Sequence, residues 1–218
     1  MAETKGPNIG DGMIRFHKVI TRALEVALTT SEQYERTGFP DDATRKGFYT
    51  YVDCLRIVLE GHHLGEDQLA FPCFRLRVPS APIETLIAEH QAMHPMLEAL
   101  RAATEKRSAS VTELRRTLTD LNDLWHRHIG KEENHFSCQV LAEVLKPVEH
   151  IELAKELSAH GREHNEPASL TLPFVLFNLP PPERAAMTKL LPPIVTKVLV
   201  PVVWKRKWAV MKPFLLAQ

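Results

Sequence analysis

Four long segments in the first 137 residues repeat their apolar side chains every three or four residues. This spacing places those side chains on one face of a helix, because an α-helix turns once in about 3.6 residues. It predicts helices over 13–37, 42–69 and 81–105, and a fourth that follows Ser110. No segment alternates apolar and polar residues between glycine turns, as a half-buried strand would. The chain is therefore expected to be all-α, an up-down-up-down four-helix bundle with a C-terminal helical extension.

Capping and helix-breaking residues mark the expected boundaries. Asp41 or Asp42 can cap the second helix, because a short acidic side chain accepts hydrogen bonds from free N–H groups of the first turn. Pro72 is expected to end that helix. Ser110, followed three residues later by Glu113, forms a capping box that opens the fourth helix.

Three regions differ in composition. Residues 1–11 are expected to form a flexible N-terminal lead, 12–137 the bundle, and 138–218 a helical, Pro-rich extension that packs on the bundle. Nine of the sixteen prolines lie from Pro167 onward, so helices there are expected to be short. The expected helices of the extension are 138–160, 182–191 and 194–211.

The extension is also basic and apolar. From Pro167 to the end it holds seven lysines and arginines but a single acid, Glu183. Packing across the bundle is the expected role of this segment. Two alternatives stay open: a homodimer interface, or a weak contact of residues 190–214 with a membrane surface. The protein is accordingly expected to be a monomer or a homodimer.

The overall composition is that of an ordinary soluble protein. The 27 basic residues balance the 27 acidic residues, so no global field favours nucleic acid as a partner. Three cysteines without a C-x-x-C pair argue against a disulfide scaffold and for a reducing compartment. No signal peptide and no transmembrane segment is apparent. A cytoplasmic location is expected.

Histidine and glutamate side chains recur on the stripes that should face the bundle interior. Residues four apart lie one helical turn above each other, so each such pair can reach one point in the bundle centre. Burying these groups without partners would cost more than a domain's margin of stability, so a cation is expected among them. The seven candidate metal ligands are His17, His62, Glu66, His90, His94, His128 and Glu132.

Seven ligands exceed what one tetrahedral zinc ion takes, and they suit two ions instead. Mixed imidazole and carboxylate donors favour iron over calcium or magnesium, which prefer oxygen alone. Two carboxylates can each bridge two ions. With one solvent-derived bridge, the donors fill one ion and leave one position open on the other. A small diatomic molecule or a peroxide could bind there.

The constellation resembles the hemerythrin-like, or HHE cation-binding, domain family. That family places an isolated His, then HxxxE, HxxxH, and HxxxE or HxxxxD on four successive helices. In this chain the segments H-H-L-G-E-D-Q-L-A-F-P and H-I-G-K-E-E are also similar to the corresponding segments of the family. The resemblance covers residues 12–137 and implies two iron ions, Fe²⁺ or Fe³⁺, joined by an oxo or hydroxo bridge.

The resemblance also implies a division of the ligands. His90, His94 and His128 would hold the coordinatively full iron, and His17 and His62 the iron with the open position. Glu66 and Glu132 would bridge the two. Oxygen-carrying relatives have HxxxxD in the fourth helix, which makes Glu133 the reserve for Glu132.

Other residues close to these positions are expected to have lesser roles. His63 points about 100° away from its neighbour and should lie at the surface or behind a ligand. Trp125 is expected to wall the site or simply to belong to the core, and Asp67 and Glu89 are expected to be exposed or to orient ligands. The remaining histidines are expected at the surface or near the pocket mouth: His126, His135, His150, His160 and His164.

Three functions fit this prediction. The first is a di-iron protein that binds or reacts with O₂, peroxide or nitric oxide, with or without turnover as an oxidoreductase. The second is an iron or oxygen sensor whose fold or partner binding depends on the metal pair. The third is a di-iron oxygenase or oxidase that acts on an organic substrate.

Overall fold

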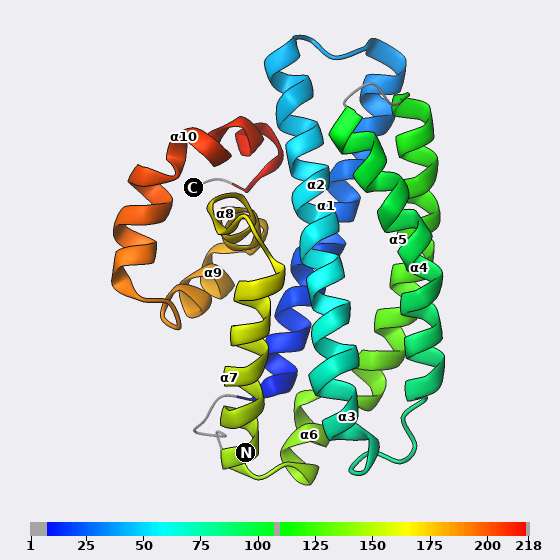
Figure 1. Ribbon diagram of the computed structural model, residues 1–218, viewed down its shortest axis with the longest axis vertical. Helices are drawn as coiled ribbons and strands as arrows, with labels where there is room; N and C mark the ends of the chain where they lie inside the picture. The colour runs from blue at the N-terminus through cyan, green and yellow to red at the C-terminus, as the bar shows by residue number, and fades with distance from the viewer. Residues whose placement is uncertain (1–7, 107–109, 217–218) are drawn as a thin grey trace.

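The computed structural model describes residues 8–106 and 110–216, and this part of the chain is helical with no strand. Four long helices run along the molecule: α1 (Ile9–Thr37), α2 (Asp42–Gly65), α4 (Ile83–Lys106) and α5 (Val111–His135). Each packs on the next, and α5 returns to α1, so the four close into an up-down-up-down bundle (Figure 1). The predicted fold class is confirmed.

Short polar side chains begin three of these helices. Asn8 caps α1 by accepting a hydrogen bond from the Gly10 N–H, and Asp41 caps α2 by accepting one from Thr44. Ser110 caps α5, as the sequence predicts. Because α1 already begins at Ile9, the helix takes in the end of the expected flexible lead, whose first seven residues lie outside the described part.

The second helix continues beyond its expected end. After α2 the chain makes a π-helical turn, η1 (Glu66–Ala70), and continues directly as α3 (Phe71–Arg75). Pro72 does not stop the chain from being helical, because it lies in the first turn of α3, where a missing N–H is tolerated. The prediction that Pro72 ends the helix is therefore wrong.

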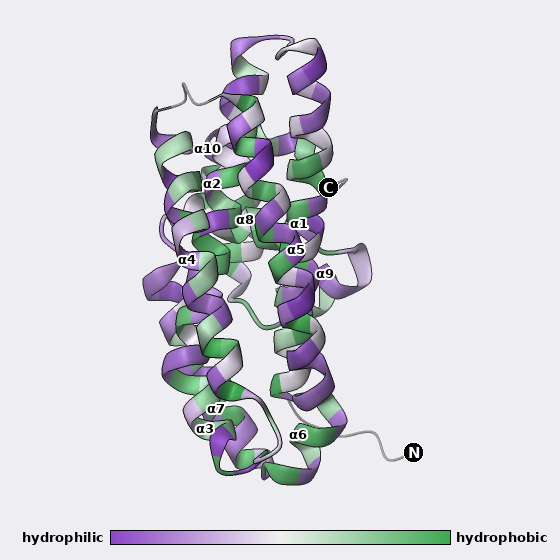
Figure 2. Ribbon diagram, turned by 90° about the vertical axis from the view of Figure 1, so that its right-hand side faces the viewer, coloured by the Kyte–Doolittle hydropathy of each residue, from purple (hydrophilic) through white to green (hydrophobic). Residues whose placement is uncertain are grey.

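The buried stripes of α4 and α5 follow steps of three and four residues, and Figure 2 shows hydrophilic and hydrophobic residues alternating along both helices. On α5 the buried residues are Leu114, Leu118, Leu121, Trp125, His128 and Glu132. On α4 they are Ile83, Leu86, His90, Met93, Leu97, Leu100 and Thr104.

Helix α2 is buried on more than one side. Fourteen of its residues are buried, among them the unbroken run from Cys54 to Leu59. Helices α1 and α4 cover one side, and elements of the C-terminal extension cover the other. A helix that is apolar almost all round belongs in a core, and α2 is the central helix of this molecule.

The extension consists of α6 (Cys138–Val144), α7 (Pro147–His164), α8 (Ala168–Asn178) and α9 (Pro181–Thr188), then a π-helical segment η2 (Val195–Val203), α10 (Lys205–Trp208) and a 3-10 segment η3 (Ala209–Phe214). The expected helix over 138–160 is interrupted at Lys146, which precedes Pro147. The helix α8 was not expected from the sequence.

Apolar and polar contacts both join the extension to the bundle. Phe174, Trp208 and Phe214 belong to the same core as the upper halves of the long helices. Arg22 of α1 donates hydrogen bonds to the side chain of Asn178 and to the Phe214 carbonyl oxygen. In the described part of the chain, no helix is long and apolar enough to cross a membrane.

The close approach of η3 to α2 depends on Gly47, because a Cβ there would overlap the Val210 carbonyl oxygen. We expect Gly47→Ala to lower the free energy of unfolding by about 1–3 kcal/mol, the usual cost of overpacking. Gly130→Ala is the matched control, since Gly130 lies in α5 with open space around it. It should raise stability by about 0.5–1 kcal/mol. Urea unfolding of both variants checks this, and an unchanged Gly47→Ala midpoint would contradict the close contact.

Candidate metal centre

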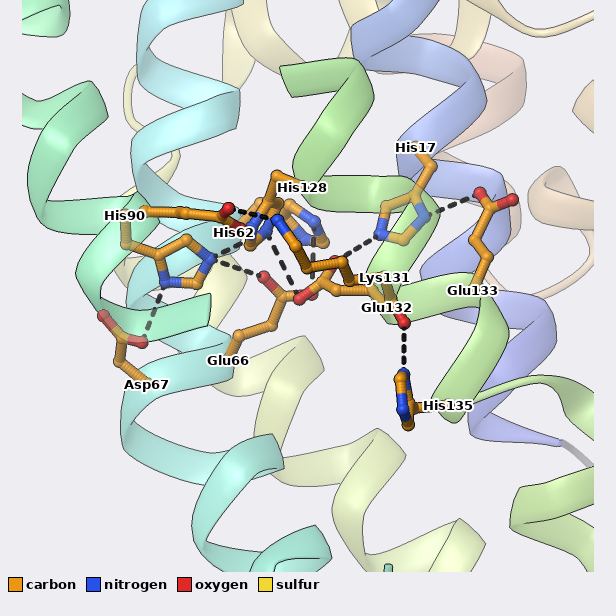
Figure 3. A network of polar contacts seen from close by, with 11 residues as sticks. His17, His62, Glu66, Asp67, His90, His128, Lys131, Glu132, Glu133 and His135 are labelled. Atoms are coloured by element: carbon orange, nitrogen blue, oxygen red, sulfur yellow. Dashed lines mark hydrogen bonds and ion pairs between the residues drawn. The ribbon is translucent and has the colours of Figure 1, made fainter. Parts of the chain in front are cut away.

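Two buried glutamates from different helices lie at the centre of a ring of histidines inside the bundle (Figure 3). Glu132 of α5 places Oε2 3.2 Å from His17 Nε2 and Oε1 3.4 Å from His128 Nε2. Glu66 places Oε1 3.2 Å from His62 Nε2 and Oε2 3.6 Å from His90 Nε2. Each carboxylate therefore directs one oxygen to one pair of histidines and its other oxygen to the second pair.

The donor atoms form two groups that share these carboxylates. His17 and His62 group with Glu66 and Glu132, and all four donor atoms lie within 4.8 Å of one another. His90 and His128 group with the same two glutamates at the same limit. His63 groups with His90 and His128, which adds one donor to the second group. One side of the centre thus has four protein donors and the other has five.

Most of these donor atoms are buried without a hydrogen-bond partner. Such atoms cost free energy when they are removed from water, so a cluster of them indicates ions that would pair with them. The unpartnered atoms of the centre are the Nε2 atoms of His17, His62 and His63 and all four carboxylate oxygens of Glu66 and Glu132.

The pair His90 and His128 points to the same conclusion. The Nδ1–H of His90 donates to Asp67 at 2.8 Å, and that of His128 donates to Glu89 at 3.2 Å. With the proton on Nδ1, each Nε2 carries a lone pair, and the two Nε2 atoms lie 3.0 Å apart. Two nitrogens at about 2.1 Å from one ion and about 90° apart have a separation of about 3.0 Å. The residues present therefore fit a shared cation.

Carboxylates outside the centre orient three of the rings. Asp67 and Glu89 hold His90 and His128, and Glu133 accepts from His17 Nδ1 at 2.9 Å. Lys131 pairs with Glu89 on its other oxygen. Such contacts fix the ring tautomer and turn Nε2 toward a metal.

Burial sets the charge of the rings on α2. It lowers the pKa of His62 and His63 well below the usual value, and the neighbouring rings His17 and His90 lower it further. Both α2 rings are neutral at pH 7 and offer lone pairs. Burial also lowers the pKa of His17, but the adjacent carboxylates of Glu132 and Glu133 outweigh it and raise the pKa overall.

The two central carboxylates have opposite pKa shifts. Burial, with the nearby charge of Glu132, raises the pKa of Glu66 well above its usual value. Burial acts on Glu132 in the same direction, but the adjacent rings of His128 and His17 hold its pKa well below the usual range. Two carboxylates this close resist ionising together, and cations between them would remove that conflict.

The structure brings six of the seven predicted ligands together and leaves His94 outside. His94 is exposed and groups with Glu60 and Glu98, of which Glu60 also pairs with Arg56 and Arg101. The prediction that His94 faces the interior is wrong, because the buried stripe of α4 steps by three residues from His90 to Met93. A residue one position later points about 100° away.

His63 takes the place expected of His94. Its ring is buried and stacks on His90 with 3.9 Å between centroids. The prediction that it lies off the site assumed that only one face of α2 is interior. The signal for its burial was in the sequence, since Cys54–Leu59 is apolar on nearly all sides. Two consecutive residues of a buried helix can point to two neighbouring donor groups. His62 belongs to the four-donor group and His63 to the five-donor group.

The remaining histidines lie away from the donor groups. His126 and His164 are exposed, and His135 Nδ1 bonds to the Lys131 carbonyl oxygen at 2.8 Å. His150 is buried, contrary to expectation, and accepts a hydrogen bond from the Ile9 N–H. His160 is half-buried beside His164 on α7.

Trp125 is fully buried against the centre, with its ring centroid 5.6 Å from that of His17 and 6.0 Å from that of His62. Its indole N–H donates to Thr21 at 2.9 Å, so its polar atom is paired outside the donor groups. Phe16 stacks on His62 at 6.1 Å. Aromatic rings line the five-donor side as well, since Trp125 lies 6.2 Å from His63 and His128, and Phe71 stacks on His90 at 5.6 Å.

Replacing His63 tests whether His63 or His94 is the third histidine ligand beside His90 and His128. We expect His63→Ala to bind metal in the five-donor group about 10–100-fold more weakly, and to lose part of it on gel filtration, because that group loses a histidine. His94→Ala should keep the native metal content, and it is the matched control. Metal analysis after anaerobic loading with Fe²⁺ and gel filtration checks both, with circular dichroism to verify folding. The opposite pattern would make His94 the ligand.

Comparison with protein families places these residues in a known context. The hemerythrin HHE cation binding domain matches residues 8–140, which include every donor of the centre. Comparisons with curated proteins and with solved structures found no significant match. This chain folds as a helical bundle with buried His and Glu groups that could hold metal. Because the family matches more than half of it, the chain belongs to the hemerythrin HHE cation-binding domain family.

Proposed function

We propose that this protein is a non-haem di-iron protein that binds or reacts with a small oxidant at one of its two irons. The observation that carries the proposal is the arrangement of Glu66 and Glu132, each with one oxygen toward each histidine group. Carboxylates placed in this way suit two ions side by side. Neutral imidazoles and carboxylates together are a donor set that iron accepts.

The two ions would have unequal protein ligands. His63, His90 and His128 with one oxygen of each glutamate would hold the first, and His17 and His62 with the other oxygens would hold the second. The second ion has one protein donor fewer, so an exogenous molecule has room there. Bound in this site, a pair of irons supplies reversible electron transfer and an open position for O₂, peroxide or nitric oxide.

The chain's own residues prepare that open side. Trp125 and Phe16 cover it with aromatic surface and exclude water. Glu133 holds the His17 ring with its Nε2 toward the centre. These contacts favour a small apolar guest over a charged one.

The histidine-rich donor set also bears on the choice between binding and hydroxylation. Five imidazoles and two carboxylates contrast with the carboxylate-rich Glu-x-x-His sites of ferritin-like di-iron bundles. Fewer anionic donors give less stabilisation to strongly oxidised iron. The donor set therefore favours reversible binding or peroxide chemistry over attack on an organic substrate.

Metal analysis combined with an optical spectrum tests the proposal. We expect about two irons per chain, and a visible absorption change when O₂ is added to the anaerobically reduced protein, reversed when O₂ is removed. Zinc alone, or a single metal ion, would contradict it. Glu66→Gln is the informative variant, since loss of a shared carboxylate should remove one or both irons, whereas Glu98→Gln at the exposed group should not.

Two further readouts separate the alternative functions. Oxygen uptake that depends on an added organic compound would indicate an oxygenase. Loss of helicity, or protease sensitivity of the extension, on chelation of the metal would indicate a sensor.

A further inference from the structure

The charge of the chain is divided unevenly along its length. Residues 184–218 contain seven lysines and arginines and no acid, although the whole chain is neutral with 27 of each sign. The first 183 residues therefore hold 20 basic and 27 acidic residues, a net charge of −7. Such a separation gives the molecule a positive end and a negative body.

The positive end also exposes aliphatic side chains. Of the large apolar side chains exposed in the described part of the chain, five lie between Leu190 and Val203. Their exposed fractions run from 39% at Val198 to 73% at Leu190. We call the following residues the cationic face: Lys189, Leu190, Ile194, Lys197, Val198, Val202, Val203, Lys205, Arg206 and Lys207, all of them exposed.

The opposite side of the same segment is anchored to the protein. Val200 is buried, and its carbonyl oxygen accepts a hydrogen bond from the Trp208 indole at 2.8 Å. Trp208 in turn packs on Phe177 of α8. Figure 1 shows η2 and α10 at the edge of the molecule, with α8 between them and the four-helix bundle. The cationic face is thus held outward rather than left loose.

Little negative charge offsets this face. Helices α8 and α10 and the segments η2 and η3 contain no acid, and in α9 Glu183 pairs with Lys18 of α1 at 2.5 Å. Arg184 lies over the Phe177 ring. The cations at 189, 197 and 205–207 therefore project from a surface without local acidic partners.

We propose that the cationic face docks on the surface of a membrane that contains anionic lipid. Its lysines and arginine would contact the headgroups, and Ile194, Val198 and Val202, which follow one another at four-residue intervals, would enter the boundary of the acyl chains. The net negative body would be oriented away from the lipid.

Charge argues for lipid over a second copy of the chain. In a two-fold dimer the same patch meets itself, so the cations of one face would meet those of the other. Like charges brought together in this way oppose association. An anionic bilayer instead complements both the cations and the aliphatic side chains.

Vesicle flotation tests the proposal with the full-length, iron-loaded protein. We expect it to float with vesicles of phosphatidylcholine and phosphatidylglycerol at low salt, to bind less at high salt, and to stay in solution with phosphatidylcholine alone. Lys205→Gln/Arg206→Gln/Lys207→Gln should weaken binding about 100-fold, since each basic residue near an anionic surface contributes about fivefold. Ile194→Ser/Val202→Ser should weaken binding with every charge retained.

The matched control removes the same charge elsewhere, with Arg116→Gln/Lys146→Gln/Lys155→Gln at exposed positions in α5, at the N-cap of α7 and within α7. It should bind vesicles like the native protein, and all variants should keep the native iron content. Absence of flotation, or an equal loss in the control, would overturn the proposal. Sedimentation equilibrium that shows a dimer broken by Ile194→Ser/Val202→Ser, without vesicle binding, would assign the face to self-association instead.

Discussion

Nitrogen and oxygen lone pairs converge in the middle of an apolar bundle, and the rest of the structure is arranged around that constraint. Neutral histidines cannot satisfy one another when their Nε2 atoms face, as His90 and His128 do at 3.0 Å. Nor can Glu66 and Glu132 ionise together in the same buried space without cost. Cations remove both penalties at once. Outer carboxylates such as Asp67 then hold the rings in the only orientation useful for binding ions.

The central position of α2 makes this convergence possible. His62 and His63 point to different donor groups, and Glu66 lies four residues from one and three from the other, so it can face both. Both rings point into the bundle, His62 beside Phe16 of α1 and His63 stacked on His90 of α4, while α7 covers another side of α2. At Gly61 a Cβ would overlap Asn165, and at Gly65 it would lie 3.2 Å from Leu157. The extension therefore packs closely on the side of α2 that carries Gly61 and Gly65.

The sequence predicted the bundle and most of the centre, and its errors have physical causes. On α5 the apolar residues Leu118, Leu121 and Trp125 continue at the same spacing to His128 and Glu132, so the sequence correctly predicts both in the interior. On α4 the four-residue spacing of His90 and His94 predicts that both share a face, but the stripe that Leu86, Met93 and Leu97 define excludes His94. The apolar run that precedes His63 on α2 indicates its burial, but its stacking on His90 of α4 is a contact between distant residues that periodicity alone does not report.

The central claim is that Glu66 and Glu132 are shared by two cations. Anomalous diffraction at the iron edge, from crystals of the iron-loaded protein, tests it most directly. We expect two peaks about 3.5–4 Å apart, each beside one oxygen of both glutamates, with His63 next to the peak that His90 and His128 share. A single peak, or a peak between His94, Glu60 and Glu98, would contradict the account.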